Sequence, residues 1–162
     1  MGTIIQISQE LVYLLLEKNM SLSVAESCTG GLISKIITDV VGSSKVFLGG
    51  VVAYSNKSKM DILKIEEELL NSKGAVSEEV ALKMAESASK IFNSDFVMSA
   101  TGIAGPDGGS AEKPVGTVYT CIKFNADDYK VVKHNFNGDR EKIRMKTATY
   151  CINQLRLYLR NL

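Results

Sequence analysis

Apolar residues recur at helical spacing along much of the chain. Near the N-terminus, Ile7, Leu11, Leu14 and Leu15 fall on one face of a helix. Ser77 stands before two glutamates, which is typical of a helix start, because a hydroxyl caps free amide groups and acids suit the positive helix end. The pattern predicts helices at residues 5–19, 29–39, 57–72 (broken), 77–92 and from about 139 onward.

Five shorter segments have the apolar and β-branched character of strands. The last two, at residues 116–124 and 129–136, flank Asn125–Asp128 and predict a hairpin. The other strands are expected at residues 22–26, 46–55 and 95–101. Helices alternate with strands until that hairpin, so the predicted fold class is α/β: a three-layer α/β/α sandwich with a mixed, mostly parallel sheet. The length predicts a single domain over residues 1–162.

Charge and hydropathy narrow the classes of partner. The 19 basic and 18 acidic side chains give a net charge of +1, whereas a protein held by nucleic-acid phosphates normally shows a basic excess. The longest apolar run, Leu11 to Leu16, is too short to span a bilayer or to serve as a signal core. We therefore expect a cytoplasmic protein with no nucleic-acid and no membrane partner, and the existence of a homo-oligomer stays open.

Metal and disulfide sites are not expected from the sequence. Cys28, Cys121 and Cys151 are widely spaced, and His134 is the only histidine. Neither a disulfide framework nor a Cys/His zinc site fits this spacing. We therefore predict three reduced thiols, no metal ligands and no cofactor.

The run from Ala25 to Gly31 is the first segment that can carry chemistry. It lies where a predicted buried strand passes into a helix, and ligands in open α/β sheets gather at such places. A helix start offers unpaired N–H groups, and two glycines let a substrate approach the backbone. A hydroxyl or thiol here, at Ser27 or Cys28, is well placed as a nucleophile beside an oxyanion hole. A simple helix cap with a tight turn is the alternative interpretation.

Lys59, just after the second predicted strand, is the candidate general base. A triad built on histidine would need His134, which falls inside a predicted hairpin strand and is interpreted as structural. A lysine is then the remaining base for Ser27, as in the Ser-Lys variants of the triad. The alternative is that Lys59 is a solvated residue at a helix start.

Two further segments have the character of a nucleotide site. The segment from Thr101 to Gly116 is rich in glycine but lacks the Gly-Lys-Ser/Thr ending of a P-loop, so it either cradles an anion or ribose or is a flexible loop. Arg140 and Arg144 stand one helical turn apart, so they either grip a phosphate together or lie on a solvated face.

Taken in order, these segments resemble a known family. The resemblance is to the C-terminal domain of the competence-damage protein CinA, a family that contains nicotinamide-nucleotide amidases, and it extends over roughly residues 5–160. Longer relatives carry a separate N-terminal domain, whose activity is not expected of this chain. The matching runs are VAESCTGG (24–31), GVVAYSNKSK (50–59), GAVS (74–77), TGIAGPDGGS (101–110), KPVGT (113–117) and GDR (138–140).

The resemblance implies the same three-layer fold and hydrolysis of nicotinamide mononucleotide to nicotinate mononucleotide and ammonia. It implies a Ser27–Lys59 dyad with Tyr54 close by. Lys57 departs from the family pattern, which often has an acid there, and this cation either depresses the pKa of Lys59 or points to solvent. The residues expected to bind the nucleotide substrate are Cys28, Thr29, Gly30, Gly31, Asn56, Thr101, Gly102, Ala104, Gly105 and Arg140.

The predicted function is therefore an amidohydrolase acting on a small-molecule nucleotide. Lys59 takes the proton of Ser27, and amides near Thr29 to Gly31 are expected to stabilise the oxyanion. A non-catalytic nucleotide-binding or partner-binding module of the same fold is the alternative. A nucleotide pyrophosphatase is less well supported, since that chemistry normally uses a metal held by an acidic cluster, which the sequence does not show.

Overall fold

The computed structural model describes residues 3–125 and 127–162. Its centre is a five-stranded sheet in the order β2-β1-β3-β4-β5. Neighbours are parallel from β2 to β3 and antiparallel from β3 to β5, so four strands point one way and only β4 runs against them. The mixed, mostly parallel sheet is thereby confirmed. The strands are β1 (Leu22–Glu26), β2 (Phe47–Val52), β3 (Phe96–Gly102), β4 (Thr117–Lys123) and β5 (Tyr129–Asn135).

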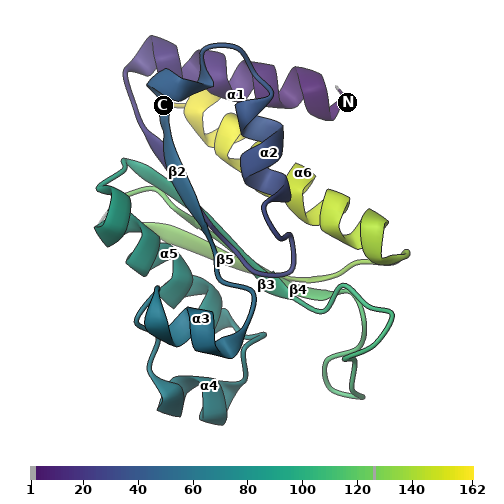
Figure 1. The fold of residues 1–162 in the computed structure, drawn as a ribbon. Coiled ribbons are helices and arrows are strands. Elements are labelled where there is room, and N and C mark those ends of the chain that lie inside the picture. The colour runs from purple at the N-terminus through teal and green to yellow at the C-terminus, as the bar shows by residue number, and fades with distance from the viewer. Residues whose placement is uncertain (1–2, 126) are drawn as a thin grey trace.

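Helices cover both faces of this sheet, which confirms the three-layer sandwich. In Figure 1, α1, α2 and α6 lie on one side, and α3, α4 and α5 lie on the other. Ile7, Leu11 and Leu15 of α1 are buried, as their spacing predicts, and they pack in one cluster with residues of α6. The helices are α1 (Ile4–Lys18), α2 (Leu32–Thr38), α3 (Asn56–Asp61), α4 (Glu67–Lys73), α5 (Glu78–Phe92) and α6 (Arg140–Arg160), with a short 3₁₀ turn at Ser43–Lys45.

The predicted cap is present at the start of α5, and a cap that was not predicted is present at the start of α6. The Ser77 hydroxyl accepts the Val80 N–H at the start of α5, and Asp139 accepts the Lys142 N–H at the start of α6. None of the helices in the described ranges is both long enough and apolar enough to cross a membrane. The predicted hairpin of β4 and β5 is formed, but the turn assigned to 125–128 includes residue 126, which lies outside the described residues.

Two predicted elements end or begin differently in the structure. The helix expected at 29–39 begins only at Leu32, because Gly30 and Gly31 have positive φ angles of 58° and 94° and form a turn first. The strand expected at 46–55 ends at Val52. The residues released from that strand form a loop in which Ser55 caps α3, with its hydroxyl accepting the Ser58 N–H. Both differences create loops at the same edge of the sheet.

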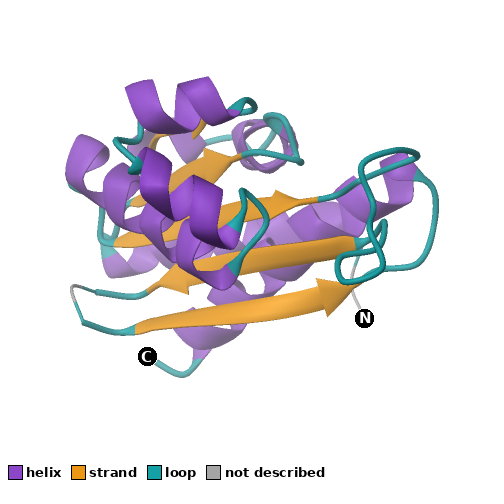
Figure 2. Ribbon diagram, turned by 90° about the horizontal axis from the view of Figure 1, so that it is seen from below, coloured by secondary structure: helices purple, strands orange, loops and turns teal. Residues whose placement is uncertain are grey.

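That edge is where the carboxyl ends of β1, β2 and β3 meet. Because these strands are parallel neighbours, the residues that follow them in sequence are close in space. Ser27 follows β1, Ala53 follows β2, and the glycine-rich segment follows β3. In Figure 2 the loop at residues 103–116 extends beyond the end of the strands. The fold therefore gathers the predicted site segments at one place.

Candidate active site

Ser27 and Lys59 meet at the end of the sheet. The Lys59 Nζ lies 2.9 Å from the Ser27 Oγ, within hydrogen-bond distance, although the two residues are 32 positions apart. The backbone N–H of Ser27 donates to the Ala100 carbonyl at 2.9 Å, which fixes the serine against β3. Only 7% of Ser27 and 2% of Lys59 is exposed, so the pair is shielded from bulk water. This is the geometry that a Ser-Lys dyad requires.

The surroundings of Lys59 suit a general base. Its Nζ also donates to the carbonyl oxygens of Ala53 at 3.0 Å and Tyr54 at 3.4 Å. A neutral amine has two hydrogens for these two carbonyls, and its lone pair is then left to accept the Ser27 hydroxyl proton. Burial lowers the pKa of Lys59, because the charged form loses its hydration. The same side chain that is normally a cation is thus biased toward its neutral form.

Lys57 does not share this environment. Its ammonium forms an ion pair with Asp61 one turn along α3, and its side chain is 80% exposed. The charge nearest to Lys59 in sequence is therefore directed to the surface and paired there. Burial, rather than repulsion by Lys57, is the cause of the lowered Lys59 pKa.

Cys28 is adjacent to Ser27 but is poorly placed to compete as a nucleophile. It is buried, and burial raises the pKa of its thiol to about 12. A thiol is a strong nucleophile only as the thiolate, which at neutral pH would be a very small fraction here. Of these two side chains, that of Ser27 is the one hydrogen-bonded to the Lys59 amine. The structure thus favours Ser27 over Cys28 as the nucleophile, whereas the residue types alone do not distinguish them.

A pocket of about 240 Å³ is lined in part by Ser27. Seven predicted site residues line it: Ser27, Cys28, Tyr54, Gly102, Ala104, Gly105 and Arg140. Three further lining residues were not predicted: Ile103, Asp107 and Gly108. All three lie in the glycine-rich segment. Its composition indicated a binding loop but did not indicate which residues of the loop would line the pocket.

Arg140 lines this pocket and is hydrogen-bonded to two other lining residues. Its guanidinium donates to the Gly105 carbonyl at 2.8 Å and to the Tyr54 hydroxyl at 2.6 Å, so it joins α6 to the other two walls. Arg144, one turn later, donates to the Thr29 carbonyl at 2.7 Å. The two arginines also line an adjoining hollow of about 420 Å³. They therefore place two permanent positive charges beside the dyad.

Besides Lys59, five predicted residues lie outside the pocket lining. The Thr101 hydroxyl donates to the Ala75 carbonyl at 2.8 Å, so it holds the loop before α5. Asn56 is exposed in the first turn of α3. Thr29 is fully buried, and its Oγ1 has no hydrogen-bond partner within the described residues. Gly30 and Gly31 shape the turn before α2 rather than the pocket wall.

The expected oxyanion hole needs a correction. The Gly31 N–H donates to the Glu26 carboxylate at 3.1 Å, and the Gly30 N–H donates to the Ser27 carbonyl at 3.0 Å. These two amides are therefore already occupied by the protein. Of the three amides expected from Thr29 to Gly31, only that of Thr29 has no recorded acceptor in the described chain. The role of Glu26 as an acceptor for these amides was not predicted, and the one sequence signal at this position was a charged residue at the end of an apolar strand.

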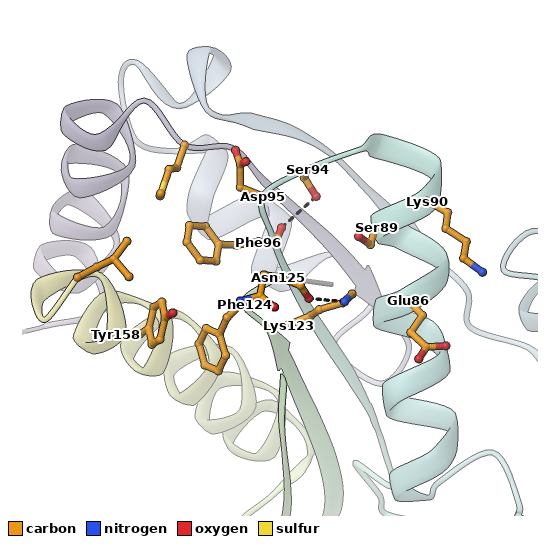
Figure 3. A pocket seen from close by; sticks show the side chains of 12 residues that line it. Glu86, Ser89, Lys90, Ser94, Asp95, Phe96, Lys123, Phe124, Asn125 and Tyr158 are labelled. Carbon is orange, nitrogen blue, oxygen red and sulfur yellow. Dashed lines mark hydrogen bonds between the residues drawn. The ribbon is translucent and has the colours of Figure 1, made fainter. Parts of the chain in front are cut away.

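A larger hollow of about 750 Å³ lies at the opposite end of β3, and Figure 3 shows its wall. The rings of Phe124 and Tyr158 stack there with their centroids 4.0 Å apart. Asp95 accepts the N–H of Ser21 at 2.7 Å and its hydroxyl at 2.6 Å. The lining of this larger hollow includes none of the predicted site residues. Size alone therefore does not identify the candidate site, which is the smaller pocket over the dyad.

His134 has the surroundings of a structural residue. Its ring stacks on Phe136 with centroids 4.7 Å apart, and its Nε2 lies 2.9 Å from the Thr120 hydroxyl. Burial lowers its pKa, so the neutral ring is favoured. Over residues 3–125 and 127–162, no three His, Cys, Asp or Glu side chains are grouped as metal ligands.

Comparison with known proteins gives consistent matches. The model of the CinA C-terminal domain matches residues 4–159. A CinA-like protein of Geotalea uraniireducens is 50% identical over 146 residues, which are 90% of this chain and 34% of the relative. A CinA-like protein of Geotalea daltonii is 53% identical over 136 residues, or 84% of this chain and 33% of the relative. The chain thus spans about a third of the length of these relatives.

Solved structures match over almost the whole chain. The competence/damage inducible protein CihA from Agrobacterium tumefaciens superposes with a TM-score of 0.94 at 37% identity, covering 99% of this chain and 97% of that one. A CinA superfamily protein from Escherichia coli superposes with a TM-score of 0.90 at 29% identity, covering 96% and 90%. The family model extends over nearly all of the sequence, with the dyad and the glycine-rich loop inside it. This chain belongs to the CinA C-terminal domain family.

Proposed function

We propose that this chain hydrolyses the carboxamide of nicotinamide mononucleotide, giving nicotinate mononucleotide and ammonia. The observation that carries the proposal is the 2.9 Å contact between Lys59 Nζ and Ser27 Oγ, with both residues buried beneath a pocket that Arg140 borders. A nucleophile paired with a desolvated amine is suited to acyl transfer. The nearby guanidinium is suited to the phosphate of a nucleotide.

The reaction begins when neutral Lys59 accepts the Ser27 proton as Oγ attacks the carboxamide carbon. The new C–O bond forms while the carbonyl electron pair moves to oxygen. The C–N bond then breaks, and the Lys59 ammonium gives its proton to the leaving nitrogen, which departs as ammonia. Water attacks the acyl-serine with Lys59 again as base, and the proton returns to Ser27 as the acid product leaves. One water is consumed, and Lys59 ends neutral.

The developing oxyanion needs donors that are not already engaged. The amides of Cys28 and Thr29 follow Ser27 directly, and neither donates to a backbone carbonyl in the part of the chain that the structure describes, but Thr29 is fully buried and lies outside the pocket lining. We assign the Cys28 amide, whose residue lines the pocket beside Ser27, as an oxyanion donor, in place of the amides of Gly30 and Gly31. Preorganised backbone N–H groups of this kind contribute strongly because they need no rearrangement during the reaction.

The test is a direct assay of the purified protein with nicotinamide mononucleotide and an excess of metal chelator. We expect equal amounts of ammonia and nicotinate mononucleotide, because Lys59 itself supplies the base. Loss of activity with chelator and its return with a divalent ion would contradict the metal-free dyad. Tight binding without any ammonia would instead indicate the non-catalytic binding module.

Replacing Arg140 tests the nucleotide part of the proposal. Arg140→Ala should raise KM for nicotinamide mononucleotide roughly tenfold or more, because a charge-assisted hydrogen bond to phosphate is lost. Nicotinamide riboside lacks the phosphate, so its KM should change much less. Lys142→Ala is the matched control, since it removes an exposed charge of the same helix that is paired with Asp139. Equal effects of Arg140→Ala on both substrates would remove Arg140 from the phosphate site.

A further inference from the structure

The carboxylate of Glu26 is fully buried one residue before the nucleophile. Its Oε2 accepts the N–H groups of Gly31 at 3.1 Å and Ile33 at 3.0 Å. Its Oε1 accepts the N–H of Ser34 at 2.9 Å and the Ser34 hydroxyl at 2.7 Å. A buried charge is costly unless it is fully hydrogen-bonded, and four donors meet that requirement.

These bonds replace a cap that α2 does not have. The residue at its N-cap is Gly31, which has no side chain to accept the free amides of the first turn. Glu26 accepts them from five to eight positions earlier in the chain. Ser27 lies in the turn between Glu26 and α2. The Glu26 side chain therefore ties the end of β1, where this turn begins, to the start of α2, where it ends.

The backbone of Glu26 also reaches the base. Its carbonyl accepts the Ala53 N–H at 2.8 Å, and the Ala53 carbonyl in turn accepts from Lys59 Nζ at 3.0 Å. Any residue at position 26 would make the backbone contact, but only a long carboxylate makes the contacts to α2. The contacts that depend on having glutamate at position 26 are therefore those that hold the Ser27 turn against α2.

We propose that Glu26 is a positioning residue, whose buried carboxylate holds the Ser27 turn so that the hydroxyl stays within hydrogen-bond distance of Lys59. The proposal rests on the proposed function of the dyad. Glu26 does not act as a base in this proposal, because both of its carboxylate oxygens accept hydrogen bonds from donors at the start of α2. A displacement of about 1 Å at a reacting atom is enough to slow a reaction by roughly a hundredfold.

Glu26→Gln is the main variant, because it keeps the shape and removes acceptors. The amide of glutamine offers one oxygen and one NH₂ group, so part of the site would set N–H against N–H. We expect kcat for ammonia release to fall roughly ten- to a hundredfold, with KM changed by less than about twofold. The Tm should fall by roughly 5–10 °C, and the assay is run well below that Tm.

Two further variants separate positioning from loss of stability. Ser99→Ala removes a buried hydrogen bond to the Ala81 carbonyl, 2.6 Å long and facing α5, and should lower Tm without lowering kcat. Ser34→Ala removes one of the four bonds to Glu26 and should lower kcat by about two- to fivefold with KM unchanged. It also provides the test if Glu26→Gln does not fold.

A substrate-independent measurement keeps the two proposals distinguishable. The rate at which a sulfonyl fluoride labels Ser27, followed by peptide mass spectrometry, reports the reactivity of the hydroxyl itself. Labelled wild type without ammonia release would reject the amidase reaction alone, and slower labelling of Glu26→Gln and Ser34→Ala would still support positioning. The positioning role of Glu26 would be overturned if Glu26→Gln and Ser34→Ala both kept the wild-type labelling rate and kcat. It would also be overturned if their losses of labelling rate and kcat were no larger than those of Ser99→Ala at the same fall in Tm.

Discussion

Ser27→Ala is expected to lose essentially all turnover, with kcat lower by at least about a thousandfold, because the nucleophile is removed. Cys28→Ala should retain turnover within about tenfold of wild type, since it removes only a buried side chain beside the pocket. The thiol cannot take over in Ser27→Ala, because burial raises the pKa of Cys28 to about 12 and keeps it protonated. The measurement is steady-state ammonia release by both variants under identical conditions.

Folding must be equal for this comparison to be valid. Circular dichroism and Tm of the two variants serve as the control, and both changes are small enough to leave the fold intact. An inactive Cys28→Ala beside an active Ser27→Ala would place the nucleophile one residue later. Activity in both would show that neither side chain forms the covalent bond.

Lys59→Arg is expected to lower kcat by roughly 10²- to 10⁴-fold, the usual contribution of a general base. A guanidinium stays protonated at every accessible pH, so it cannot accept the Ser27 proton. Lys59→Ala should lose rate similarly while still binding the nucleotide. Near-normal turnover in Lys59→Arg would make Lys59 an electrostatic residue, and Tyr54 would be the next candidate base, since the Glu26 carboxylate is engaged by four donors.

The pH dependence of the wild type follows from the same residue. Burial lowers the pKa of Lys59, so its neutral form accumulates at a lower pH than for a lysine in water. The base is active when neutral, so kcat/KM should rise as pH increases through the lowered pKa and level off above it. A profile that falls over this range would show that the protonated amine is the active form.

The helices and strands were predictable because the spacing of apolar residues reflects which face of each element is buried. The buried positions Ile7, Leu11 and Leu15 of α1 and all five strands were anticipated from the apolar pattern, although β2 ends at Val52, earlier than expected. The Ser77 cap was anticipated from its hydroxyl and the two glutamates that follow it. The wrong start of the helix expected at 29–39 has a local cause. Gly30 and Gly31 have positive φ angles, which glycine permits but does not require, so the sequence could not fix where the turn ended.

The site was predictable in its residue types but not in its contacts. Ser27 and Lys59 were paired by elimination and by family resemblance, and their 2.9 Å separation depends on parallel strand pairing. Arg140 meets Tyr54 across 86 positions of sequence, and no local pattern encodes that contact. The acceptor role of Glu26 was missed because three of its four donors are backbone amides, which carry no sequence signal.

Trapping the covalent intermediate would identify the nucleophile directly. The protein is mixed with nicotinamide mononucleotide, quenched in acid within the first turnover, digested and mapped by mass spectrometry. The dyad predicts a nicotinoyl-nucleotide ester on the peptide that contains Ser27, with fragmentation assigning it to Ser27, and no adduct in Ser27→Ala. An adduct on Cys28, or product formed in the first turnover without any adduct, would contradict Ser27 as the nucleophile.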